Sequence, residues 1–117
     1  MGKRTKGDGL KDPAIIKVLT MLESKFGQGA FNITDHWEGD LCAVGIASVN
    51  DNRQLVYVSA FGMPDGQYYI ELENPPAPNS DLPYELVGDM DHIDFEDLTE
   101  IVAKHLSLQN VPKQTSE

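Results

Sequence analysis

The sequence predicts a single α+β domain, with one helix before an antiparallel sheet and a second helix after it. Two amphipathic patterns of helical period, near the two ends of the chain, enclose short apolar segments separated by hairpin-sized turns. A chain of 117 residues suits one domain with one core. We expect residues 12–108 to form this domain, between a disordered basic tail at 1–11 and a disordered tail at 109–117.

The first helix is expected over residues 13–26. Asp12 supplies a side-chain oxygen for the free amides of the first turn, and Pro13 has the fixed φ that suits the first helical position. Gly27 stands where a left-handed residue would end the helix. The apolar stripe that faces the core consists of Ile15, Val18, Leu19, Leu22 and Phe26.

Strand patterns follow at short intervals. The four segments expected to form strands are 30–34, 41–49, 54–61 and 67–73. Their connections are short enough for hairpins, and in the last of them Pro64 and Asp65 suit a type I turn with Gly66 in the left-handed position after it. The sheet is therefore predicted to be an antiparallel meander.

The C-terminal part begins with a proline-rich loop over residues 74–83, and 84–87 is a possible short edge strand. A second helix is expected over residues 95–107, capped by Asp94 and with Asp97 at its third position. Its apolar face consists of Leu98, Ile101, Val102 and Leu106.

Each helix has one apolar stripe, so both are expected to cover the same face of the sheet and to leave the other face open. The fourth strand alternates, with Tyr68, Ile70 and Leu72 on one side and Tyr69, Glu71 and Glu73 on the other. If the first set faces the helices, the second lies on the open face. It is joined there either by Leu55, Tyr57 and Phe61 or by Val56, Val58 and Ala60. An open face of this composition is typical of a partner or dimer surface.

The charge is uneven along the chain. The formal net charge is −10, and residues 18–112 contain three bases against 16 acids, a balance of 3 − 16 = −13. Such a surface repels phosphate backbones and attracts basic proteins, which argues against nucleic-acid binding. No apolar run reaches the roughly 20 residues of a membrane span, and no secretory signal is recognisable, so we expect a cytoplasmic protein without membrane contact.

The segment TDHWEGDLC, residues 34–42, permits three interpretations. Asp35, His36, Glu38 and Asp40 have the side chains for a metal site, and His36 with a carboxylate has those for acid–base chemistry. Acids and a glycine are also typical of a solvated turn at a hairpin tip. In the third interpretation Trp37 and Glu38 contact a protein partner. Neighbouring residues of a strand point to opposite faces, which favours the second and third interpretations over the first.

A second acidic cluster contains Asp89, Asp91 and His92. With Asp89 as position 1 of a calcium loop, Glu100 takes position 12, but Ile93 and Asp94 occupy positions that need a ligand and a glycine. Helix capping and solvated acids explain this cluster better. No nucleophile motif and no phosphate loop is recognisable, so we assign no catalytic residue, metal ligand or cofactor.

The helix, meander, helix order and the acidic surface are similar to those of small bacterial partner-binding proteins such as immunity proteins and secretion chaperones, in composition and order only. We therefore predict a non-enzymatic module that binds a basic protein through the open sheet face, with a homodimer also possible. The predicted contact residues are Trp37, Glu38, Tyr57, Phe61, Tyr69, Glu71 and Glu73. The alternative is a small metal-dependent hydrolase that uses Asp35, His36 and Asp40 or Asp89, Asp91 and His92.

Overall fold

The computed structural model describes residues 12–34 and 41–109. The elements, in chain order, are α1 (Pro13–Phe26), β2 (Phe31–Thr34), β3 (Ala43–Ser48), β4 (Leu55–Ser59), β5 (Gln67–Asn74), β6 (Glu85–Asp94) and α2 (Phe95–Leu106). This order confirms the predicted α+β fold. The predicted tails at 1–11 and 110–117 and the segment 35–40 lie outside the described residues.

Helix α1 has the predicted bounds because its caps are encoded locally. The Asp12 carboxylate accepts a hydrogen bond of 2.9 Å from the Ala14 amide, and Pro13 occupies the first turn. Gly27 ends the helix with a φ of 99°, a conformation that side chains with a Cβ rarely adopt.

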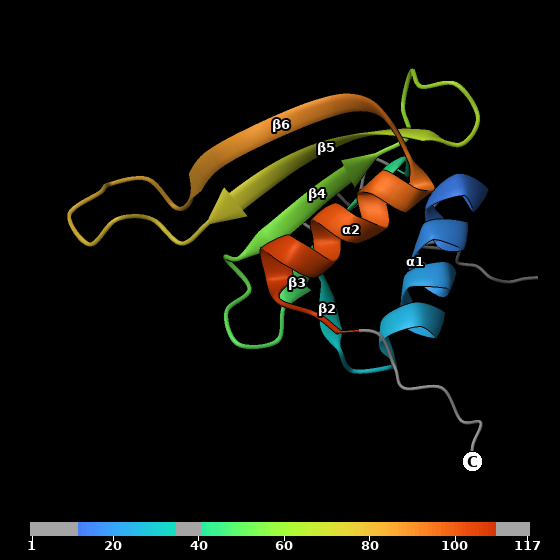
Figure 1. Cartoon of the computed structure of the whole chain (residues 1–117). Coiled ribbons are helices and arrows are strands. Elements are labelled where there is room, and N and C mark those ends of the chain that lie inside the picture. Colours follow the sequence, from blue (N-terminus) through green and yellow to red (C-terminus); the bar gives the residue numbers. More distant parts are fainter. Residues whose placement is uncertain (1–11, 35–40, 110–117) are drawn as a thin grey trace, which may run out of the picture.

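The five strands form one antiparallel meander in the order β2-β3-β4-β5-β6, so that each strand pairs with its neighbours in sequence (Figure 1). The turn between β4 and β5 lies one residue later than predicted. The Gln67 amide donates a hydrogen bond of 3.0 Å to the Pro64 carbonyl, so Asp65 and Gly66 are the central residues, and Gly66 has the expected left-handed conformation with a φ of 79°. Hairpins of this kind fix the register of each pair.

Strand β6 is longer than the sequence predicts. The expected edge strand covered 84–87, whereas β6 extends over Glu85–Asp94 and continues directly into α2. Its pairing with β5 shifts at two places, which leaves Val87 and the Asp91–His92 pair as bulges, with His92 at a φ of 56°. The acidic cluster that resembled a metal loop is therefore part of a bulged edge strand.

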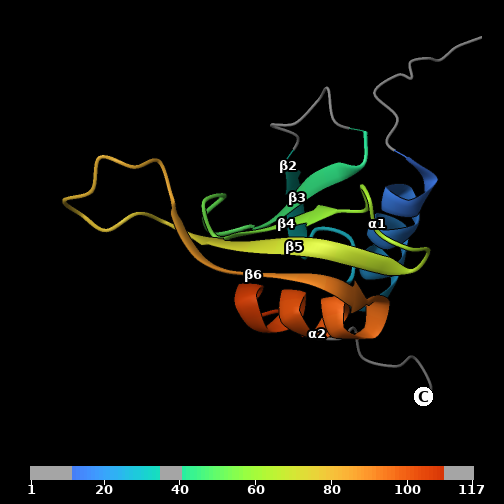
Figure 2. The same cartoon turned by 90° about the horizontal axis from the view of Figure 1, so that it is seen from above.

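Both helices cover the same face of the sheet, as predicted. Side chains of α1 and α2 share one core with β-strand residues that pair across the sheet, such as Val44 with Val58 and Val58 with Ile70. Figure 2 shows α2 lying along β6 and β5 on one side of the sheet. The completely buried side chains of this core include Ile15, Val18, Leu22, Ile46, Val56, Leu98 and Val102.

Helix α2 begins at the predicted cap. The Asp94 carboxylate accepts a hydrogen bond of 2.9 Å from the Asp97 amide, and Glu96 and Asp97 place negative charge at the positive end of the helix. The helix ends one residue earlier than expected, at Leu106, because Ser107 takes a left-handed conformation with a φ of 58°.

Candidate functional site

The sheet face away from the helices, called the outer face below, is defined by the strand register. Tyr57 pairs with Gly45 on one side and Glu71 on the other, and Glu71 pairs in turn with Asp89 of β6. Paired residues of an antiparallel sheet point to the same face, so these side chains form one row. The sequence left two alternatives for β4, and the register selects the one that places Tyr57 with Glu71.

The outer face is less exposed near β3 than near β6. Ala43, Gly45 and Ala47 are buried on it, and the exposed fraction of Leu55 is only 2%. Tyr57, Tyr69 and Glu71 are partly exposed and Asp89 is exposed. The surface that a partner can reach therefore lies over β4, β5 and β6, which is narrower than a wholly uncovered sheet.

The two tyrosines of the outer face are in contact with each other and with an acid. Their ring centroids lie 6.3 Å apart in an edge-to-face arrangement with an interplanar angle of 73°. The Tyr69 hydroxyl donates a hydrogen bond of 2.5 Å to Glu71 Oε2. This hydrogen bond, with partial burial and the charges of Glu71 and Asp89, raises the pKa of Tyr69 above its ordinary value. The hydrogen bond also fixes the position of the Glu71 carboxylate relative to the Tyr69 ring.

The other predicted contact residues are placed differently. The exposed fraction of Glu73 is only 7%, although it pairs on the outer face with Leu55 and Leu86. Phe61 lies in the turn after β4 and has an exposed fraction of 75%. Trp37 and Glu38 lie outside the described residues. Of the predicted set, the structure thus brings Tyr57, Tyr69 and Glu71 together on an accessible surface.

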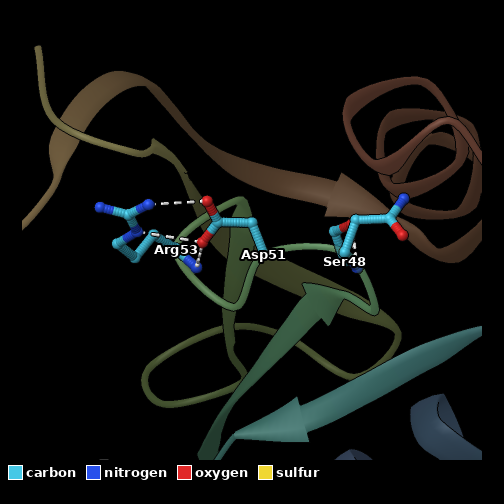
Figure 3. Close-up of polar contacts among 4 residues, drawn as sticks. Ser48, Asp51 and Arg53 are labelled. Atoms are coloured by element: carbon cyan, nitrogen blue, oxygen red, sulfur yellow. Dashed lines mark hydrogen bonds and ion pairs between the residues drawn. The ribbon is translucent and has the colours of Figure 1, made fainter.

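Negative charge is concentrated beside this surface. The described residues contain 14 acids and four bases, and residues 85–100 contain seven acids and no lysine or arginine. Arg53 is neutralised locally, since its guanidinium forms an ion pair of 2.9 Å with Asp51 in the turn between β3 and β4 (Figure 3). Four of the seven acids lie on β6, so the rim next to Glu71 is anionic, whereas the three acids of α2 lie on the helix-covered side of the sheet.

The catalytic and metal-binding alternatives gain no support from the described part of the chain. Within it, no group of three or more His, Cys, Asp or Glu side chains could hold a metal ion. Asp91 lies 3.2 Å from His92 Nδ1, while the bulge separates this exposed pair from the regular pairing of Asp89 with Glu71. Asp35, His36 and Asp40 lie outside the described residues.

A groove that the sequence did not predict lies between β6 and α2. Its cavity volume is about 550 Å³, and its lining residues are Gln54, Leu72, Asn74, Val87, Met90, Ile101, Lys104 and His105. His105 closes one side, where its Nε2 lies 2.9 Å from the Glu73 carbonyl and its own carbonyl accepts a hydrogen bond from Gln54. Expecting a long β6 would have placed Val87 and Met90 beside α2, but the pattern of that segment does not indicate a strand.

Comparison of the chain with protein-family models, with curated proteins and with solved structures finds no match. Over residues 12–34 and 41–109, neither helix has the length and apolar character needed to cross a bilayer.

Proposed function

We propose that this protein is a non-enzymatic binding module that engages a basic protein partner through its outer face. The observation that carries the proposal is the row formed by Tyr57, Glu71 and Asp89, with Tyr69 beside it, at the acidic edge of the sheet. Tyrosines provide large contact area at a small entropic cost, and the neighbouring carboxylates select for positive charge.

The acidic rim should increase the rate at which the proposed complex forms. The four acids of β6 produce a negative potential at the edge of the outer face, and such a potential accelerates encounter with a basic surface. A homodimer through the same face would bring Glu71 and Asp89 of one copy against acids of the other. Charge therefore favours a basic heterologous partner over a second copy.

Affinity capture from cells of the source organism, followed by mass spectrometry, tests the proposal. We expect the protein to retain a basic protein. The variant that combines Tyr57→Ala and Tyr69→Ala should retain at least tenfold less of that protein. Raising sodium chloride to about 0.5 M should release the complex, since screening weakens the attraction of exposed charges. The matched control combines Ile16→Ala and Met21→Ala, which truncates two exposed apolar residues of α1.

Two results would contradict the proposal. One is retention of the same proteins by the tyrosine variant and the control variant. The other is a set of retained proteins that are all acidic or whose capture is insensitive to salt. Circular dichroism of each variant shows whether the fold is preserved, so that loss of binding is not confused with unfolding.

A further inference from the structure

Strand β6 borders two surfaces at once. It is the last strand of the described sheet, so one of its two edges has no strand beside it in the part of the chain that the structure describes (Figure 1). On the outer face it carries Asp89 next to Glu71, and on the helix face it carries Met90 next to Ile70. A strand added to β6 would continue both surfaces, because its successive side chains would alternate between them.

On the helix face, the added strand would meet the groove between β6 and α2. Val87 and Met90 are large apolar residues that remain exposed there, and Leu72 and Ile101 form the apolar floor. Exposed apolar side chains of this kind would be covered by the apolar side chains of an incoming chain.

The negative charge of β6 indicates which kind of chain would pair with its edge. A second copy that paired through β6 would place acids such as Glu85, Asp89 and Asp91 against the same acids, and like charges directly opposite each other are destabilising. A segment with basic side chains on its outer side faces Asp89 and Glu71 instead. The two bulges interrupt β6 on either side of Gly88–Met90, so the uninterrupted stretch that an added strand can pair with is short.

We propose that an extended segment of the basic partner adds to the edge of β6 as a short sixth strand. Its apolar side chains enter the groove between β6 and α2, and its alternate lysine or arginine side chains lie over Asp89 and Glu71. This inference deepens the proposed function, since it rests on a basic partner and names the part of that partner which binds.

The test uses an acetylated and amidated peptide of alternating lysine and valine, seven residues long, with the full-length protein. A second peptide of the same sequence carries N-methyl groups on alternate backbone amides, so that it keeps the charge and side chains but cannot donate those hydrogen bonds to a strand edge. We expect the first peptide to bind at least tenfold more tightly in an NMR titration. It should also slow amide hydrogen exchange between Leu86 and Asp91.

Two methionines provide a matched pair of variants. Met90 in the groove and Met21 on α1 have exposed fractions of 38% and 39%, so Met90→Lys and Met21→Lys make the same change of charge at equal exposure. Met90→Lys should lower the affinity for the first peptide at least tenfold, while Met21→Lys should change this affinity by less than twofold.

The outcomes separate the inference from the function on which it rests. If the two peptides bound equally, and the NMR chemical-shift changes were centred on Tyr57 and Tyr69, strand addition would be overturned. The proposal of a basic partner would still stand. Absence of saturable binding at about 1 mM peptide would also overturn strand addition, and affinity capture with the tyrosine variant would then decide the proposed function independently. Equal effects of the two lysine variants would show that the groove is not used.

Discussion

At the scale of single residues, the hydrogen bond from Tyr69 to Glu71 should control the ionisation of the phenol. In Glu71→Gln we expect the pKa of Tyr69 to fall towards the ordinary tyrosine value of 10.0, because the largest cause of its elevation is the hydrogen bond to the carboxylate. The chemical shift of the tyrosine ring carbon that bears the hydroxyl, followed by NMR as pH rises, measures this change. Glu100→Gln, which removes the same charge from an exposed position on α2, should leave the pH titration curve of Tyr69 unchanged.

The same hydrogen bond links stability to alkaline pH. Because the folded-state pKa of Tyr69 is raised, its contribution to the free energy of unfolding is complete below pH 10.0 and is lost as the pH rises towards the folded-state value. Burial also raises the pKa of Tyr68, so a smaller loss remains in Glu71→Gln. Urea unfolding at a series of pH values should show a shallower alkaline decline in this variant than in Glu100→Gln. Parallel declines would contradict the assignment.

At the scale of elements, α2 should depend on its cap. Asp94→Ala removes the acceptor for the Asp97 amide and should lower the free energy of unfolding by about 1 kcal/mol, the usual effect of losing an N-cap side chain. Urea denaturation measures the difference. Asp81→Ala, in the exposed loop before β6, removes an equal charge without a cap and should change stability by less than about 0.5 kcal/mol. An equal loss in both variants would mean that charge and not capping is responsible.

The helices and strands also show which elements can be predicted from sequence patterns alone. Both helices and the strands from β2 to β5 were predictable within two residues at each end, because caps, turn residues and apolar periodicity agree locally. Strand β6 was not, since its residues are mostly exposed and the segment from Gly88 to Asp94 is rich in acids. It forms a strand because β5 offers a free edge and α2 must be positioned over the core, and both causes are tertiary.

At the scale of the whole molecule, the site was only partly predictable for a related reason. Alternation along β5 was enough to place Tyr69 and Glu71 on the outer face, and it also suggested that Glu73 was accessible. The burial of Glu73 and the narrowing of the outer face near β3 depend on how the sheet curves and on what packs around it. The sequence pattern of a single strand does not indicate either of these. The groove required two further facts, the length of β6 and the position of α2 beneath it.

The whole molecule should be stabilised by salt. The described residues carry 14 acids and four bases, so the folded state brings like charges together, and sodium chloride screens them over a Debye length of about 10 Å at 0.1 M. Raising sodium chloride from about 10 mM to 0.5 M should increase the free energy of unfolding by about 1 kcal/mol, or about 4–8 °C in Tm for a domain of this size. Thermal unfolding followed by circular dichroism measures the shift.

The control for this prediction is pH. Near pH 4, where about half of the carboxyl groups are protonated, the same addition of salt should stabilise the fold less. A salt effect of equal size at pH 4 and pH 7 would point to general strengthening of the hydrophobic effect and would contradict an origin in charge repulsion. Since the same acids are proposed to attract a basic partner, salt should act with opposite signs on the two equilibria, stabilising the isolated fold while weakening the complex. Measuring both in one series of buffers separates loss of the partner from loss of the fold.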